Sequence, residues 1–256
     1  DIRRAVEWAN NDDNIHAIVV TGAGRSFCSG YDLKQFSEKS EVGPNSINQS
    51  MPWDPTVDFK LMKGFTDDFF SLWRSYKPTI AKVQGHCVAG GSDIALCCDM
   101  IIMEDNAVIG YPPARVWGCP TTAMWVYRVG PEQAKRMLLT GDVIDGKEAE
   151  RIGLVMKSVP PVELDGFVDS LVRRVSSVPK NQLFMQKMVI NQAIENMGLA
   201  STQTLATFFD GVTRHSPEGV WFKEQAETRG FNSVVKERDS GDPIATEVAK
   251  PSHRVE

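Results

Sequence analysis

Two glycine-containing turns, each directly after a short apolar run, constrain the fold of this chain most. The first turn, GAGRSFCSGYDL (residues 22–33), follows the run at 16–21, and the second, GHCVAGGSDIAL (85–96), follows the run at 79–84. Short apolar runs bounded by turn residues are typical of buried strands. The sequence therefore predicts two buried strands that each lead into a tight turn.

Segments of helical and strand character alternate around these turns. Apolar residues recur at helical spacing over 2–9 and 57–76, and a short apolar helix at 92–98 precedes a third strand at 99–103. This alternation predicts an α/β core with a mainly parallel sheet. From residue 122 onward nearly every segment is amphipathic, which predicts a helical layer for the second half of the chain. The helices expected there span 122–129, 131–139, 147–152, 162–177, 181–195, 202–213 and 217–229.

Charge and hydropathy exclude two classes of protein. The formal net charge is -5 and the pI is near 5.5, whereas a nucleic-acid binder normally carries a basic face. The longest apolar runs, 15–20 and 95–103, end well before the roughly 20 residues that a membrane-spanning helix needs. We therefore expect a globular protein of 256 residues that neither binds nucleic acid nor spans a membrane.

The five cysteines indicate a reducing environment. Their number is odd, and no pair has metal-ligand spacing backed by histidines, so we expect no metal site. Cys97 and Cys98 lie in an apolar stretch, where buried thiols are the usual form. We therefore expect a cytoplasmic protein.

The two ends of the chain differ in character. The first residues, DIRRAVEWANN, have the pattern of the middle of a helix, so we expect the natural protein to begin earlier. Residues 232–256 are charged and lack the apolar spacing of a core helix, which predicts a loosely ordered tail.

The two glycine turns are the first candidates for a functional site. Ligands of α/β sheets bind at the carboxyl ends of strands, where glycines allow the backbone to approach a ligand closely. Two such turns can direct two amides at one carbonyl oxygen, although both can equally be simple tight connections. GAGRSF lacks the third glycine of a dinucleotide fingerprint, and the first turn lacks the Gly-Lys-Ser/Thr ending of a phosphate loop.

Three segments in order resemble the crotonase (enoyl-CoA hydratase/isomerase) superfamily over residues 1–231. They are GAGRSFCSGYDLK, KPTIAKVQGHCVAGGSDIALCCDMIIMEDNAVIGYP and LLTGDVIDGKEAERIGLV. The resemblance implies a ββα spiral core over residues 1–195 and a C-terminal helical trimerisation region over 196–231. It also implies a homotrimer or a dimer of trimers, and an acyl-CoA thioester substrate that carries the only coenzyme required.

The resemblance assigns the oxyanion hole to two backbone amides. They are the N–H of Tyr31, after the CSG turn, and the N–H of Gly90, in AGG. A thioester oxygen gains negative charge as an enolate forms, and each preorganised amide is worth about 3 kcal/mol to that state.

The same resemblance places the coenzyme A portion near the first turn. Arg25 and Lys34 are expected near the nucleotide phosphates, with Ser29 and Gly30 in contact with the coenzyme between them. A solvated surface charge remains the alternative for each cation. Asp32 is expected to act as a cap or structural hydrogen-bonding group.

The catalytic acids depart from the hydratase pattern. Enoyl-CoA hydratases hold one water between two glutamates. The first of these positions is Asp93, one methylene shorter, and the second falls on Pro113 or Ala114, neither of which can move a proton. Losing a positioned acid or base commonly costs about 10² to 10⁴ in rate.

Other side chains are candidates for the missing role. His86 can titrate near neutrality, but a histidine beside a glycine turn is more often structural. Less well placed are Tyr111, Arg115 and Glu104. Three aromatic residues either line the acyl pocket or pack in the core: Trp117, Phe208 and Phe209.

These observations predict an enoyl-CoA hydratase-like lyase in which Asp93 moves a proton. Isomerisation or carbon–carbon cleavage through the same enolate is the alternative enzymatic activity. A binding protein that has lost turnover is the alternative of another class, because the second carboxylate is missing. The polar segment at 37–61 is expected to form a flap that selects the acyl chain.

Overall fold

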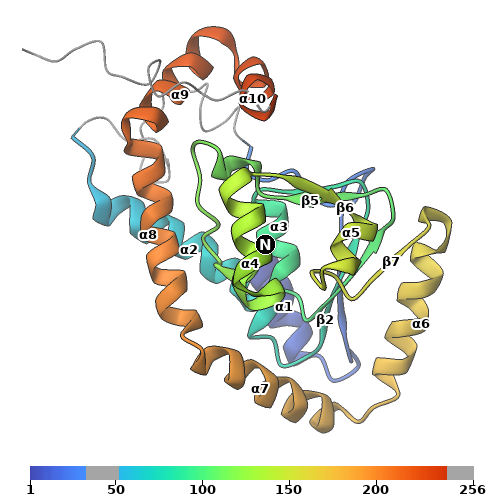
Figure 1. The fold of residues 1–256 in the computed structure, drawn as a ribbon. Coiled ribbons are helices and arrows are strands. Elements are labelled where there is room, and N and C mark those ends of the chain that lie inside the picture. The colour runs from blue at the N-terminus through green and yellow to red at the C-terminus, as the bar shows by residue number, and fades with distance from the viewer. Residues whose placement is uncertain (33–51, 241–256) are drawn as a thin grey trace, which may run out of the picture.

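The computed structural model describes residues 1–32 and 52–240, in which helices surround two small sheets (Figure 1). The strands are β1 (Ile18–Thr21), β2 (Thr79–Val83), β3 (His86–Val88), β4 (Met100–Glu104), β5 (Val108–Gly110), β6 (Val143–Asp145) and β7 (Lys157–Val159). The α-helices are α1 (Ile2–Asn11), α2 (Pro55–Trp73), α3 (Gly90–Leu96), α4 (Met124–Thr140), α5 (Gly146–Arg151), α6 (Leu164–Ser176), α7 (Lys180–Asn196), α8 (Leu199–His215), α9 (Pro217–Arg229) and α10 (Phe231–Asp239). Two 3₁₀ turns, η2 (Pro112–Ala114) and η3 (Pro161–Glu163), complete the described elements.

The predicted α/β class with a mainly parallel sheet is confirmed. One sheet has the strand order β1-β2-β4-β7 and is parallel throughout, with Ile18 opposite Thr79 and Ile80 opposite Met100. The second has the order β3-β5-β6, in which β3 and β5 are parallel and β6 is antiparallel to β5. β2 is buried along almost its whole length, as expected for a parallel strand covered on both faces.

The predicted helical layer of the second half is confirmed, but it also contains two strands that were not predicted, β6 and β7. Each has only three residues, too few to show the alternation that identifies a strand from sequence. The expected helices do form there. The two expected over 122–129 and 131–139 are joined as α4, which is interrupted at Gly130 with φ 74 and ψ 171.

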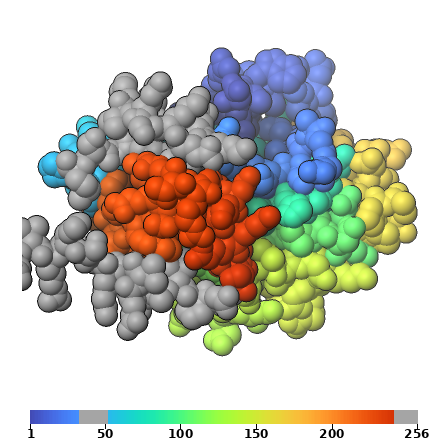
Figure 2. Space-filling view, turned by 90° about the horizontal axis from the view of Figure 1, so that it is seen from above, coloured from blue at the N-terminus to red at the C-terminus, as the bar shows by residue number. Residues whose placement is uncertain are grey.

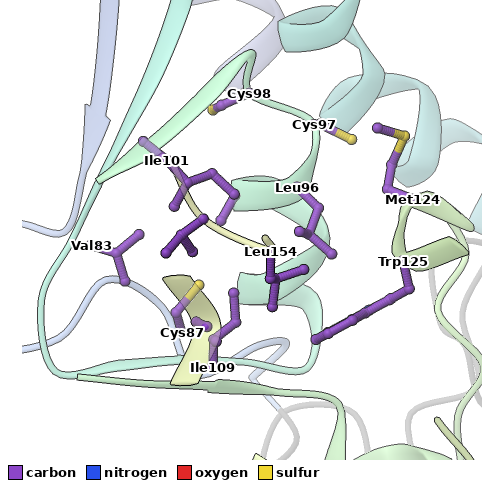
Figure 3. Packing of buried hydrophobic residues seen from close by; sticks show 14 of the residues in the cluster. Val83, Cys87, Leu96, Cys97, Cys98, Ile101, Ile109, Met124, Trp125 and Leu154 are labelled. Carbon is purple, nitrogen blue, oxygen red and sulfur yellow. The ribbon is translucent and has the colours of Figure 1, made fainter. Parts of the chain in front are cut away.

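The main hydrophobic core lies between the strands and helices α3 and α4 (Figure 3). Its central side chains include Val83, Leu96, Ile101, Ile109 and Trp125. The neighbouring thiols of Cys97 and Cys98 are fully buried, as the apolar stretch around them predicts.

The C-terminal helices follow one another around this core (Figure 1). Helix α8 packs on α2, and α9 packs on both α8 and α10. In the view from above, the orange and red surface of these helices adjoins the green surface of the core (Figure 2). The Lys187 ammonium of α7 connects the two parts, because it pairs with Asp99 at 2.9 Å and donates to the Leu72 carbonyl at 3.1 Å.

Part of the predicted loose tail is helical. Helix α10 covers Phe231–Asp239, and its Phe231 and Val234 are buried at helical spacing. The Phe231 ring meets that of Phe222 edge-on, with centroids 6.1 Å apart. These apolar residues dock a helix whose last four positions, 236–239, are charged.

Two predicted segments fall partly or wholly outside the described residues. The remainder of the tail, 241–256, and the first part of the predicted flap, 37–51, lie there. The end of the predicted flap is instead the first turn of α2, which Asp54 caps by accepting the N–H of Thr56 at 2.8 Å. None of the described helices is both long and apolar enough to cross a membrane.

Candidate functional site

The two glycine turns lie against each other. The first turn pairs with β3, since the Cys28 N–H donates to the His86 carbonyl at 3.0 Å and the Val88 N–H donates to the Cys28 carbonyl at 3.1 Å. This pairing carries the end of the first turn to the start of α3. Two segments separated by most of α2 and β2 therefore form one wall.

Glycine is required where the turns meet. Gly30 has φ +101, and a Cβ there would lie 2.9 Å from the Ala89 Cβ. A Cβ on Gly91 would lie 2.2 Å from the Cys28 carbonyl oxygen, whereas one on Gly90 would lie at an ordinary contact distance of 3.4 Å from the Tyr31 ring. Residues with no side chain thus allow the backbones that carry the Tyr31 and Gly90 amides to come together.

The start of α3 has an unusual backbone conformation. Ala89 has φ 54 and ψ -129, a conformation that costs a residue with a Cβ roughly 1–3 kcal/mol and is typical of functional sites. Gly90 follows as the first residue of the helix, so its N–H has no intrahelical acceptor. The strained Ala89 therefore directly precedes a backbone N–H, that of Gly90, which can donate to an external acceptor.

A small cavity of about 50 Å³ opens beside this wall. Its lining comes from both glycine turns, the loop after β5, α2 and the C-terminal helices. The lining residues are Tyr31, Met62, Ala89, Gly90, Tyr111, Pro113, Trp117, Asp210, Arg214 and Arg238. The described part of the chain holds no group of three or more His, Cys, Asp or Glu side chains suited to a metal ion.

Asp93 lies one helical turn after Gly90, behind the cavity wall. Its side chain is only 2% exposed and is not among the lining residues. The Thr122 hydroxyl donates to its carboxylate. Burial raises the pKa of Asp93 to about 7, although the Thr122 hydrogen bonds act in the opposite direction and the Asp210 charge adds to the increase. The carboxyl group is therefore poised to exchange a proton near neutral pH.

A buried group of three charges lies beside the cavity, and two of its members, Asp210 and Arg214, line it. Arg214 donates one guanidinium nitrogen to Asp210 and another to Asp58 of α2. The Cys119 N–H donates to the second oxygen of Asp210 at 3.0 Å. Burial raises the pKa of Asp210, while Arg214 and the Cys119 amide counteract that increase. One cation thus serves two buried carboxylates.

Sequence analysis did not identify these three residues. The Asp210 and Arg214 side chains are four positions apart in the amphipathic segment FFDGVTRH, a spacing that places them on one helix face. Gly211 was the second indication, because a Cβ there would lie 2.2 Å from an Asp58 oxygen. Only the packing of α8 on α2 reveals that this helix face lines the cavity.

The candidate replacements for the missing acid are not in the cavity, with one exception. His86 is exposed on β3, and its Nδ1 lies 3.4 Å from the Ser26 hydroxyl. Glu104 accepts the Gly85 N–H at 3.2 Å, and Arg115 donates to the Thr140 carbonyl at 2.8 Å. Tyr111 alone lines the cavity, where burial raises the pKa of its hydroxyl well above the usual value.

The predicted contacts for coenzyme A occupy the surface of the first turn. Arg25 and Ser29 are exposed there, while Gly30 lies at the meeting point of the turns. Asp32 is exposed as well, and Lys34 lies outside the described residues.

The three aromatic residues separate into two groups. Trp117 lines the cavity and has φ 78, which is rare for a residue with a side chain. Phe208 and Phe209 are 40% and 47% exposed and belong neither to the cavity lining nor to the buried core. Pro113, at one of the two positions expected for the second carboxylate, does line the cavity.

Comparisons with known proteins agree with this geometry. The sequence matches the enoyl-CoA hydratase/isomerase family over residues 1–229. A crotonyl-CoA hydratase from Syntrophomonas wolfei is 29% identical over 93% of this chain and 84% of its own length. The structure superposes on an enoyl-CoA hydratase from Mycobacterium smegmatis with a TM-score of 0.87 and 42% identity, covering 93% of this chain and 82% of that one. An enoyl-CoA hydratase/isomerase from Xanthobacter autotrophicus Py2 gives a TM-score of 0.83 and 29% identity, covering 93% and 86%. The chain therefore belongs to the enoyl-CoA hydratase/isomerase family.

Proposed function

We propose that this protein adds water across the double bond of a trans-2-enoyl-CoA thioester. The close approach of Gly30 to Gly90, which lines the cavity, is the observation that carries the proposal. It brings together the backbone segments whose amides, on Tyr31 and Gly90, are to hold the thioester oxygen. Charge that develops on this oxygen is then stabilised by groups fixed before the reaction begins.

The reaction requires two proton movements. Water loses a proton to a base as its oxygen bonds to the β carbon, the π electrons move through the carbonyl to the thioester oxygen, and the α carbon of the resulting enolate takes up a proton. Asp93 supplies that last proton in this proposal. A carboxyl group with a pKa of about 7 is protonated often enough to donate near neutral pH and is readily reprotonated.

The coenzyme A portion of the substrate is proposed to lie across the first turn. Exposed Arg25 and Ser29 leave their side chains accessible to the phosphates there, and a guanidinium fork matches phosphate geometry. No separate cofactor enters this proposal, because the substrate carries the coenzyme.

Isomerisation of the enoyl double bond is a second candidate. The observation that favours it is Pro113, a residue that cannot transfer protons, in the cavity lining. An isomerase needs one group that carries a proton between two carbons, and Asp93 alone satisfies that requirement. Incubation of a 3-enoyl-CoA with the enzyme distinguishes the two reactions.

Assembly as a homotrimer or a dimer of trimers is also proposed. Support comes from α7, α8 and the turn between them, which present exposed apolar side chains that include Val189, Ile190, Met197 and Leu205. A cytoplasmic setting is proposed as well, since all five cysteines are free thiols.

Hydration of a short and a long trans-2-enoyl-CoA, followed by loss of the conjugated thioester absorbance, tests the proposal. We expect turnover by the wild type and a loss of about 10² or more in kcat for Asp93→Asn. Asp169→Asn, an exposed aspartate on α6, is the matched control and should retain the wild-type rate. Full activity in Asp93→Asn contradicts the role of Asp93, and absence of any hydration by the wild type contradicts the proposal.

A further inference from the structure

We propose that Asp210 of α8 is the second catalytic carboxylate of this enzyme and activates the attacking water. The inference rests on the proposed hydration. It moves the acid–base group from the loop after β5 to a C-terminal helix on the other side of the cavity.

The position of Asp210 is the first argument. Among the described residues that line the cavity, Asp210 is the only carboxylate, and it shares this lining with Tyr31, Gly90 and Pro113. The cavity therefore has an acid in its lining even though the loop after β5 provides only Pro113 and Ala114. Asp93, by comparison, is not among the lining residues and lies behind the wall that carries Gly90.

The charge balance around Asp210 is the second argument. Arg214 is shared between Asp210 and Asp58, so one positive charge faces two carboxylates. Arg214, Asp58 and Asp210 together carry a net negative charge, so one buried carboxylate is left that can accept a proton. Each Asp210 oxygen accepts one hydrogen bond, from the Cys119 N–H or from Arg214, and each has a second lone pair for a water molecule.

These contacts also fix the carboxylate. Arg214 holds it from the same helix and Cys119 from the loop that carries Trp117, while Gly211 lets Asp58 approach closely. Catalytic groups must be held to within about 0.5 Å of the productive geometry by neighbours whose own positions are fixed. A carboxylate held on both oxygens meets that requirement.

The proton balance of the reaction then closes. Asp210 takes one proton from water as the water oxygen bonds to the β carbon, and the α carbon receives one proton from Asp93. Asp210 afterwards returns its proton to solvent while Asp93 takes one up, so the net change is the addition of one water. The two carboxyl groups begin in opposite states in this proposal: Asp93 is protonated because it is buried beside a neutral hydroxyl, and Asp210 is ionised because it pairs with the Arg214 guanidinium.

The test compares isosteric variants of the two aspartates that pair with Arg214. Asp210→Asn and Asp58→Asn each remove one carboxylate from Arg214, but only Asp210 lines the cavity. We expect Asp210→Asn to lose at least 100-fold in kcat for hydration, and Asp58→Asn to lose less than tenfold. Affinity for butyryl-CoA and exchange of its α proton in D₂O should stay within fivefold of the wild type in Asp210→Asn, because both depend on the oxyanion amides and Asp93.

Several results would overturn the inference. Equal losses of hydration in the two variants would make Asp210 part of a structural ion pair only, and so would loss of butyryl-CoA binding in a folded Asp210→Asn. Wild-type hydration by Asp210→Asn would remove it from the mechanism. A wild-type enzyme that hydrates neither test substrate refutes the proposed hydration itself, whereas the outcomes above refute Asp210 alone.

Discussion

The cavity has two walls of opposite chemical character. The wall from the α/β core consists of backbone held by Gly30, Ala89 and Gly90, with Asp93 behind it, and its geometry depends on the absence of side chains. The wall from the C-terminal helices depends on charged side chains, with Asp210 and Arg214 in the lining. In the proposed mechanism the core wall stabilises the thioester enolate, and the helical wall supplies the carboxylate that activates water.

The largest expected effect falls on the core wall. Gly91→Ala would place a Cβ 2.2 Å from the Cys28 carbonyl oxygen and force the two turns apart. We expect loss of hydration and a fall of about 4 kcal/mol in the free energy of unfolding. Gly64→Ala is the matched control, because Gly64 lies in helix α2 with open space around it, and should gain about 0.5–1 kcal/mol. Urea unfolding and the hydration assay measure both, and an active Gly91→Ala would show that the contact of the turns is dispensable.

Arg214→Met tests the helical wall. It leaves Asp58 and Asp210 buried without their cation, which is expected to cost about 3 kcal/mol in the free energy of unfolding. Arg229→Met removes a partly exposed ion pair with Glu237 and should cost less than about 1 kcal/mol. If thermal and urea unfolding give equal losses for the two, the buried charges do not stabilise α8 on α2.

A smaller effect of opposite sign is expected at Asp93. Its pKa is raised from 3.8 to about 7 in the folded protein, so folding favours the protonated form. That contribution is fully present below pH 4 and is lost as the pH rises to about 7. Asp93→Asn should therefore be more stable than the wild type at pH 8 and nearly equal to it at pH 4. Urea unfolding at both pH values measures this, and a wild-type advantage at pH 8 would contradict the raised pKa.

The smallest expected effect is at the surface of the first turn. Arg25→Ala should raise the KM for an enoyl-CoA by about three- to tenfold with kcat unchanged, as expected for an exposed phosphate contact. The effect should shrink with added salt. Arg173→Ala, on the exposed face of α6, is the control. An unchanged KM in Arg25→Ala would mean that the coenzyme phosphates do not contact Arg25.

Sequence analysis predicted the core wall better than the helical wall. The glycine turns lie close to their strands, and resemblance to a known family pointed to Tyr31 and Gly90, which line the cavity, and to Asp93, which does not; their catalytic roles stay predictions. Strands such as β6 and β7 were missed because three residues carry no periodic pattern. Asp210 was missed for another reason, because its place in the cavity depends on the packing of α8 against α2, contacts between residues far apart in the chain.

The Lys187 contacts of α7 have a consequence for how the enzyme loses activity. Lys187 and Asn191 attach α7, the helix that leads into α8, to the core by binding Asp99 and backbone carbonyls. Local unfolding that breaks these contacts would separate the two walls while the sheets stay folded, because cooperative units of a protein open at different free energies. Hydrogen exchange in α8 would then precede exchange in β2 and β4, and catalysis would fail at a temperature at which the core is still intact.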